Sequence, residues 1–238
     1  MGRMVLFLTS FLAWIPRPPL RVRHLIREMH SIGTRSLLVI VLTSSFTGMV
    51  LALQGYHTLN QYGSEAVLGS LVALSLIREL GPVMAALMVT ARAGSAMSAE
   101  LGIMKITEQV DAMDVLTLNP VKYLVVPKML AGVLVLPLLV SIFDVVGIFG
   151  GYLVGVRLLG VNAGSYFHRM AIDVDFEDVY TGLVKSLVFG LTLTWVCCYK
   201  GYHCGHGAKG VSRATTEAVV LSAVLILVWD YFMTSILL

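Results

Sequence analysis

Apolar residues gather into five long runs that are separated by short polar stretches. The runs are Leu37–Leu53, Val67–Ala91, Val125–Val156, Tyr180–Tyr199 and Ala218–Leu238. A helix that rises 1.5 Å per residue needs roughly 20 apolar residues to cross the hydrocarbon layer of a bilayer. The pattern therefore predicts an all-α membrane protein with five transmembrane helices.

A sixth and shorter apolar run, Met4–Ile15, precedes these five. It is too short to span a bilayer. No small-x-small cleavage site follows it, and Pro16, Arg17 and further basic residues come next, which disfavours a secretory signal peptide. We expect an uncleaved amphipathic helix that lies in the headgroup layer.

The composition agrees with a membrane protein. Hydrophobic residues make up 57% of the 238-residue chain and charged residues only 13%, whereas soluble domains carry about 25% charged residues. This balance excludes a soluble domain and a disordered chain, and three cysteines give no disulfide framework. The net charge of +3 is modest, and the positions of the charged residues along the chain suit the topology of a membrane protein better than nucleic-acid binding.

The positive charges orient the predicted spans. Thirteen Lys and Arg residues fall in the N-terminal segment, the second-to-third loop and the fourth-to-fifth loop, against only Arg157 and Arg169 on the opposite side. Because Lys and Arg accumulate in cytoplasmic loops, the N-terminus is predicted to be cytoplasmic and the C-terminus to lie outside.

Two adjacent charges, Arg78 and Glu79, interrupt the second run, and Pro82 follows them. Each charge costs at least about 2.5 kcal/mol at that depth unless it meets a partner or a cavity. Neighbouring helical positions diverge by about 100°, so the two side chains cannot share a face. Two interpretations stay open: charge pairs that fix helix packing, or a polar patch in a cavity filled by water or headgroups. Pro82 frees a backbone carbonyl one turn earlier and favours a bend.

The loop after the second run contains a short helical pattern. Ile106, Val110 and Met113 recur on one side, and three acids occupy the other, namely Glu108, Asp111 and Asp114. Asn119-Pro120 is expected to end this cytoplasmic helix. An acidic face is repelled by anionic headgroups, so docking to another protein is favoured over lipid contact.

Other intramembrane features are assigned to packing. Gly147, Gly151 and Gly155 form a smooth stripe that favours close helix–helix contact. Asp144 and Asp230 are isolated acids for which polar contacts in the bundle are favoured over proton relays. Lys185 lies near a span end and is expected to extend toward the interface.

Several motifs are absent from the sequence. There is no G-x-x-x-x-G-K-[ST], G-x-S-x-G or H-E-x-x-H, so nucleotide binding and recognised hydrolase chemistry are not expected in this chain. The stretch Tyr202–His206 matches no zinc spacing, and no metal site is predicted. An odd span count without internal repeats disfavours a transporter made of inverted halves, so a transport pathway would need two copies.

A series of motifs in fixed order resembles the MlaE family of ABC-transporter permeases from about Leu37 onward. They are Leu53–Tyr56, Arg78–Pro82, Ala91–Ala96, Ala99–Gly102, Thr107–Gln109, Asn119–Pro120 and Gly210–Thr216. The resemblance implies a non-enzymatic permease subunit in the bacterial inner membrane, with an N-terminal segment 1–36 and a five-helix permease domain 37–238.

The same resemblance implies partners and a substrate. A homodimer would bind a cytoplasmic MlaF-like ATPase, which holds ATP and Mg, and a periplasmic hexamer of an MlaD-like MCE protein, and it would move phospholipid to maintain outer-membrane lipid asymmetry. The alternative is an ion-coupled carrier or channel without an ATPase partner.

Residue by residue, the resemblance implies two sites. The lipid-binding candidates are Leu51, Gln54, Leu59, Tyr62, Glu79 and Leu80. The ATPase-coupling candidates are Thr107, Glu108, Gln109, Asp111, Met113 and Asp114. Because an anionic Glu79 would repel a phosphate, three states are open for it: protonated, holding a water, or neutralised by Arg78.

Overall fold

The computed structural model describes residues 2–14 and 22–237, and every regular element in those residues is helical. Arg17 and the other residues of the basic stretch 15–21, together with Leu238, lie outside the described residues. These helical elements follow one another in chain order. The bounds are α1 Gly2–Trp14, α2 Val22–Asn60, η1 Glu65–Val67, α3 Leu68–Ser75, η2 Leu76–Leu80, α4 Gly81–Val89, η3 Thr90–Gly94, α5 Ser95–Ile106, α6 Gln109–Val115, η4 Val121–Val125, α7 Val126–Tyr152, η5 Leu153–Leu158, α8 Ala163–Asp173, α9 Phe176–Tyr202 and α10 Gly207–Leu237.

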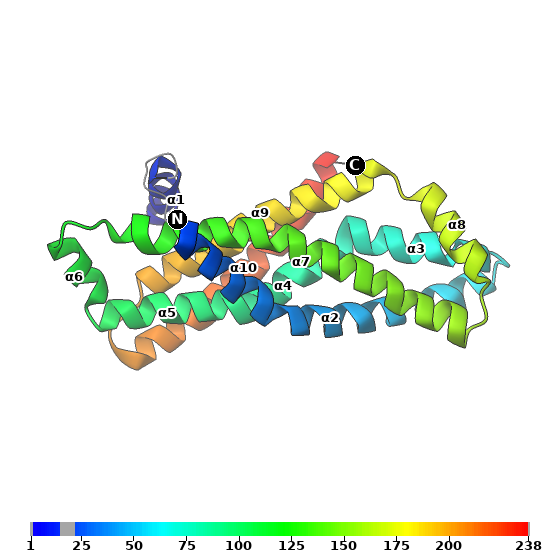
Figure 1. Ribbon diagram of the computed structural model, residues 1–238, viewed down its shortest axis with the longest axis horizontal. Helices are drawn as coiled ribbons and strands as arrows, with labels where there is room; N and C mark the ends of the chain where they lie inside the picture. Colours follow the sequence, from blue (N-terminus) through cyan, green and yellow to red (C-terminus); the bar gives the residue numbers. More distant parts are fainter. Residues whose placement is uncertain (1, 15–21, 238) are drawn as a thin grey trace.

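Five helical stretches are long and apolar enough to cross a membrane, which confirms the predicted number of spans. They cover Val22–Asn60, Glu65–Ile106, Val121–Leu158, Phe176–Tyr202 and Gly207–Leu237. All five run along the long axis of an elongated bundle (Figure 1). Each stretch extends beyond its apolar run, because helical hydrogen bonding continues into the polar flanks.

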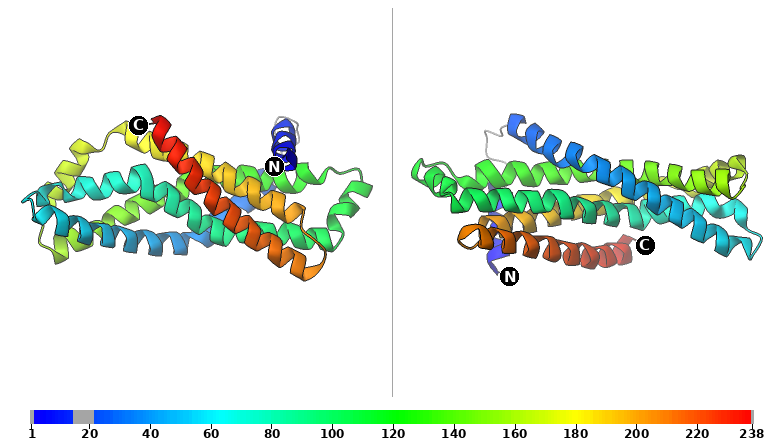
Figure 2. Two further views of the ribbon diagram at one scale, coloured as in Figure 1. Left: turned by 180° about the vertical axis from the view of Figure 1, so that it is seen from behind. Right: turned by 90° about the horizontal axis from the view of Figure 1, so that it is seen from below.

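Helix α1 lies across the bundle, roughly perpendicular to the spans (Figures 1 and 2). Its Phe7 and Phe11 are buried in a small core with Val125 and Met129. The indole Nε1 of Trp195 donates to the carbonyl of Met4 at 3.0 Å. An apolar helix at a right angle to the spans has the orientation of an interfacial helix, as the sequence predicts.

Helices α2 and α7 contact each other through their backbones. A Cβ on Gly48 would overlap the backbone of Gly147, and a Cβ on Gly150 would approach the backbone of Ser45. The Ser44 hydroxyl donates to the carbonyl of Phe143. Small residues permit this approach, which maximises dispersion contact between helices in a membrane. On the same glycine stripe, Cβ atoms on Gly151 and Gly155 would lie 2.9 and 3.0 Å from side chains of α3.

The second span is interrupted by two π-helical turns, η2 and η3. Turn η2 ends at Leu80, immediately before α4, and Pro82 occupies the first turn of α4. Proline cannot donate to the carbonyl one turn earlier, so the regular ladder is broken here. Single π turns of this kind often occur at functional sites.

Helix α6 is the short amphipathic helix that the sequence predicts after the second span. Val110 is fully buried, whereas Asp111 and Asp114 are exposed. It begins after Glu108, whose backbone has φ 59°, and it ends at Val115. Asn119 does not end it, contrary to expectation. Instead its side-chain oxygen accepts the N–H of Val121 at 3.0 Å and so caps the helix that follows.

Candidate functional site

Lys185 is the centre of a polar cluster in the membrane-spanning part of the bundle. Its side chain is 0% exposed, and its Nζ lies 2.8 Å from Glu79 Oε2 and 3.3 Å from Asp230 Oδ1. The expectation that Lys185 extends toward the interface is therefore wrong. The side chain faces η2 and α10 because it projects from the inner face of α9, where two carboxylates compensate its charge.

Two uncharged groups complete the coordination of this lysine. Nζ donates to the hydroxyl of Thr234 at 2.7 Å and to the carbonyl of Arg78 at 3.0 Å. That carbonyl is the one that Pro82 leaves without its usual donor, since proline has no N–H. Thr234 in turn donates to Glu79 at 3.1 Å. The bend at Pro82 thus supplies an acceptor that an unbroken helix would not offer.

Arg78 points to a different partner from its neighbour. Its Nε lies 2.5 Å from Oδ1 of Asp178. Asp178 also accepts the backbone N–H of Asp175 at 3.0 Å as part of a capping box at the start of α9. Each of the two adjacent charges therefore has an interhelical partner, and the cation beside Glu79 is Lys185, not Arg78.

A cavity of about 220 Å³ lies beside these ion pairs. Its lining is contributed by η2, the first half of α9 and the end of α10, and comprises Arg78, Glu79, Glu177, Asp178, Thr181, Lys185, Thr234 and Leu237. Both interpretations of Arg78 and Glu79 therefore apply. The two charges form ion pairs between helices, and the same ion pairs border a polar cavity. Glu79 is 38% exposed and can contact whatever enters this cavity.

The lipid-binding candidates fall into two groups in one copy of the chain. Glu79 and Leu80 lie in η2, whereas Leu51, Gln54 and Leu59 lie in the last turns of α2 and Tyr62 lies in the turn after it. Leu51 and Leu59 pack partly against the core, while Gln54 is exposed and Tyr62 is 77% exposed. The group on α2 does not line the cavity beside Glu79.

The coupling candidates all lie around α6 at the opposite end of the bundle from α8 (Figure 1). Thr107 donates to the carbonyl of Ile103 at 2.8 Å and ends α5. Asp111 binds Lys105 at 2.6 Å. Glu108, Gln109 and Asp114 are exposed, and Met113 is half-buried. Val115 and Leu116, which the sequence does not single out, are 84% and 67% exposed.

Comparison with known proteins decides the family. The family model described as "Permease MlaE" matches residues 25–236. The chain belongs to the MlaE permease family. It is 42% identical over 230 residues to the Haemophilus influenzae intermembrane phospholipid transport system permease protein MlaE, covering 95% of this chain and 88% of that protein.

Two other relatives extend the range of this similarity. A probable ABC transporter permease protein of Rickettsia felis is 45% identical over 235 residues, which cover 99% of this chain and 91% of the relative. The chloroplastic protein TRIGALACTOSYLDIACYLGLYCEROL 1 of Arabidopsis thaliana is 34% identical over 213 residues, covering 90% of this chain and 61% of that protein. This MlaE permease is thus a multi-pass membrane protein of the ABC-permease kind.

Sequence reasoning missed most of the partners in the cluster. Asp178 precedes the fourth apolar run, and Asp230 and Thr234 lie more than 40 residues after Lys185. The signal available in the sequence was that three further charges, Asp178, Lys185 and Asp230, lie within or next to the later apolar runs. Their mutual distances depend on how three helices pack, which the apolar pattern does not specify.

Proposed function

We propose that this MlaE permease moves phospholipid between the bacterial inner membrane and a periplasmic MCE-protein ring, as a homodimer driven by a separate ATPase. The observation that supports this proposal is the cavity beside Glu79 and Lys185, which brings charged groups to a depth that otherwise contains only acyl chains. Such groups are costly in a membrane and typically mark a substrate pathway.

The chemistry of the cavity suits a lipid headgroup. Arg78, whose side chain is 40% exposed, offers donors to a phosphate, and Glu79 offers an acceptor for the ammonium or hydroxyl groups that many headgroups carry. The acyl chains would lie against the apolar faces of α2 and α10. The two groups of lipid-binding candidates would then contact different parts of one lipid.

A second copy of the chain would close this cavity into a chamber. Only 11% of the apolar window of α10 is buried within one copy. On the exposed face, Val224, Leu227, Val228, Tyr231 and Phe232 form a shallow apolar groove. On the flank of this groove, Asp230 and Thr234 of the same helix extend into the polar cluster. A partner seated beside α10 would therefore lie next to the charged groups.

The ATPase is proposed to dock on α6. Exposed acids together with the exposed Val115 and Leu116 suit a protein groove better than an anionic membrane surface. This assignment places α6 and the N-terminus in the cytoplasm, as the distribution of Lys and Arg predicts. The MCE ring would then contact the periplasmic end, where α8 and the C-terminus lie (Figure 2).

Lipid that co-purifies with the protein tests the proposal. We expect the double variant Leu51→Arg, Tyr62→Arg to lose a bound phospholipid that mass spectrometry detects with the wild type. The matched control is Leu158→Arg, Phe176→Arg, because these side chains are 71% and 83% exposed and are not among the lipid-binding candidates. Retention of the lipid by the first variant, or its loss from both, contradicts the proposed pocket.

Transport in liposomes separates the permease from its alternative. With the ATPase added, lipid movement is expected only in the presence of ATP. Conductance or gradient-driven uptake by this chain alone would instead support an ion-coupled carrier or channel.

A further inference from the structure

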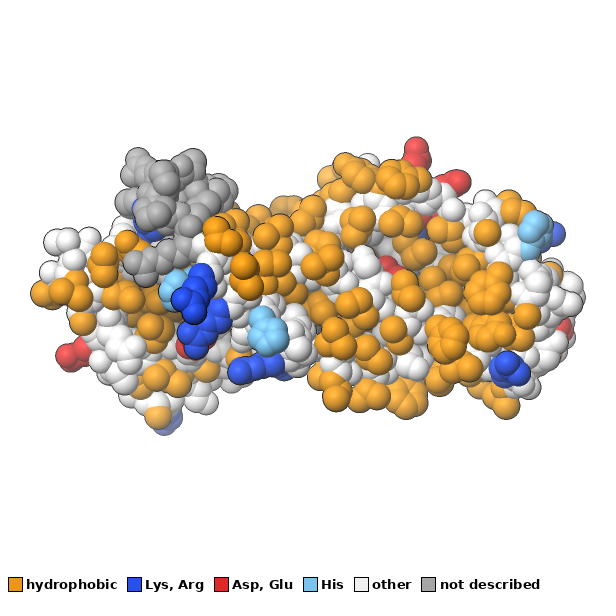
Figure 3. All heavy atoms as spheres, viewed as in Figure 1, with side chains coloured by type: hydrophobic (Ala, Val, Ile, Leu, Met, Phe, Trp, Pro, Cys, Tyr) orange, Lys and Arg blue, Asp and Glu red, His pale blue; other side chains and the backbone are white. Residues whose placement is uncertain are grey.

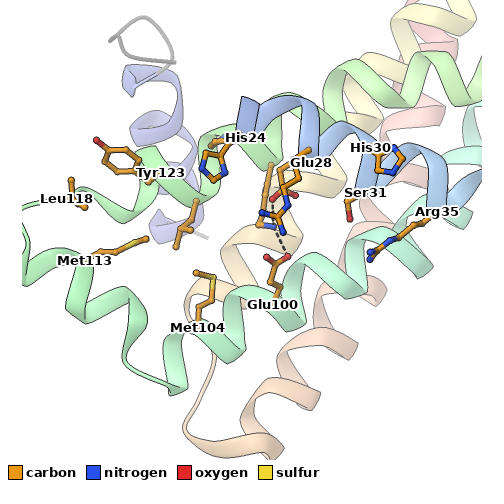
Figure 4. Close-up of a pocket in the computed structure, with 14 residues that line it drawn as sticks. His24, Glu28, His30, Ser31, Arg35, Glu100, Met104, Met113, Leu118 and Tyr123 are labelled. Atoms are coloured by element: carbon orange, nitrogen blue, oxygen red, sulfur yellow. Dashed lines mark hydrogen bonds and ion pairs between the residues drawn. The ribbon is translucent and has the colours of Figure 1, made fainter. Parts of the chain in front are cut away.

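A second pocket, of about 560 Å³, lies at the α6 end of the molecule. It is formed by the first turns of α2, the end of α5 and the loop that leads into α7 (Figure 4). Ser31 and Arg35 lie toward one end of it, and Met113 and Leu118 lie toward the other. This pocket is separate from the cavity beside Glu79, and the proposed transport route does not use it.

The buried charge in the pocket is already compensated. Lys128, whose side chain is 3% exposed, binds Glu28 at 3.0 Å and Glu100 at 2.7 Å. These contacts link α2, α5 and α7 and form a rigid wall. Both acids of the pocket contact the lysine, whose single charge offsets one of them.

Two arginines of the pocket are not compensated in this way. Among the residues that the structure describes, neither Arg27 nor Arg35 forms an ion pair. Arg92 adds a third positive charge that interacts with Arg35, and it donates to the carbonyl of the pocket residue Ser31 at 3.1 Å. With the histidines neutral, Arg27, Arg35 and Lys128 against Glu28 and Glu100 leave the pocket lining positive, and Arg92 adds to that charge, which favours an anionic ligand.

The depth of the pocket identifies the source of that anion. The pocket residues Tyr123 and Leu124 belong to η4, and Leu124 packs into the same small core as Phe7 of the interfacial helix α1. The pocket therefore lies at the level of the headgroups. Lys, Arg and His side chains gather over the first half of α2, and a broad hydrophobic surface continues along the bundle beside them (Figure 3).

We propose that this pocket binds the phosphate of an anionic glycerophospholipid of the cytoplasmic leaflet, between Arg27 and Arg35, with its acyl chains on the adjacent apolar surface. Guanidinium groups match phosphate because they donate two parallel hydrogen bonds. The site rests on the membrane orientation proposed above, but it does not depend on transport. A bound lipid would bridge the start of α2 and the end of α5, next to α6.

Photo-crosslinking tests the site in the full chain. A photo-crosslinking amino acid is placed at Met104, which lines the pocket, and the protein is reconstituted in phosphatidylcholine vesicles that contain phosphatidylglycerol. Mass spectrometry then identifies lipid attached to that position. We expect phosphatidylglycerol adducts with the wild-type arginines and at least a tenfold loss in Arg27→Gln, Arg35→Gln. Arg27→Lys, Arg35→Lys keeps the charge and should lose less.

The control removes the same charge at the same end of the molecule. Arg23→Gln, Lys209→Gln changes two residues that do not line the pocket, and it should leave the adducts unchanged. Equal adducts in the Arg27→Gln, Arg35→Gln variant, or an equal loss in the control, would overturn the proposal. Suppression of the adducts by millimolar glycerol 3-phosphate would show a site for soluble phosphates and would overturn the lipid assignment.

A second crosslinking position distinguishes this proposal from the proposed function. Adducts at Tyr62 report on the lipid-binding candidates at the end of α2, and they should not change in Arg27→Gln, Arg35→Gln. Loss of adducts at both positions would mean a general loss of lipid contact and counts against the site. If ATP-driven transport fails while adducts at Met104 persist, the transport proposal fails and this site stands.

Discussion

Replacing Lys185 with methionine is the most direct probe of the intramembrane cluster. Methionine has a similar length and retains most of the packing, but it removes the ammonium that lies between Glu79 and Asp230. It also removes the donor to the carbonyl of Arg78 that Pro82 leaves free. Two carboxylates would then share a poorly hydrated site without a cation.

The expected loss of stability follows from how deeply the lysine is buried. Breaking a buried pair by removing one partner costs about 3–5 kcal/mol. Glu79 is 38% exposed and Asp230 is 22% exposed, so partial hydration of the acids lowers the expected loss to about 2–3 kcal/mol. The measurement is the free energy of unfolding in mixed micelles of mild detergent and dodecyl sulfate.

The same helix provides a matched control. Lys200→Met removes a lysine that is 26% exposed and lies 2.8 Å from Glu217, which is a surface ion pair. Such pairs contribute about 0–1 kcal/mol. Equal losses for the two variants, or no loss for Lys185→Met, would refute the reasoning. Adding Glu79→Gln and Asp230→Asn to Lys185→Met should recover part of the stability, because the uncompensated charges are then absent.

Three further predictions concern other parts of the molecule. Gly48→Ala should lower the unfolding free energy by about 1–3 kcal/mol through overpacking of α2 on α7, whereas Gly205→Ala, whose Cβ would meet its nearest atom at 3.8 Å, should change it little. Burial raises the pKa of Tyr166 to about 12, so its unfolded form ionises first and stability should fall above about pH 10, less steeply in Tyr166→Phe, as denaturation at stepped pH would show. Glu108→Lys should weaken ATPase binding in a pull-down while Glu65→Lys, a control at the other end of the molecule, should not. A steeper alkaline loss in Tyr166→Phe, or equal binding by the two charge-reversal variants, would contradict the respective argument.

The sequence is sufficient to predict elements whose cause is local. Five spans follow from apolar length alone, and α6 follows from the spacing of Val110 and Met113 against exposed acids. The orientation of α1 across the bundle follows because the apolar run Met4–Ile15 is too short to span a bilayer. The end of α6 was misplaced because Asn119 was interpreted as ending one helix, whereas its side chain caps the next.

The partners of the intramembrane charges could not be predicted in the same way. Sequence reasoning establishes that Arg78 and Glu79 need separate partners, since adjacent helical positions diverge by about 100°. Which residues serve depends on the rotation of α9 and α10 about their own axes. That rotation places Lys185 inside the bundle, whereas its position in the sequence suggested the interface.

Different contacts hold α2 to α7 and α10 to its neighbours. Apolar packing gives helices little preference for one another over lipid, so close contact and polar bonds decide which helices associate in a membrane. Between α2 and α7 the backbones meet at Gly48 and Gly147. Near its C-terminal end, α10 is instead attached to α9 and to the second span through Lys185, which binds Glu79, Asp230 and Thr234. Lys185→Met should therefore loosen the C-terminal half of α10 selectively, and hydrogen exchange should rise there while α2 and α7 keep their protection. A uniform rise over all five spans would mean that the cluster supports the whole bundle and not this one attachment.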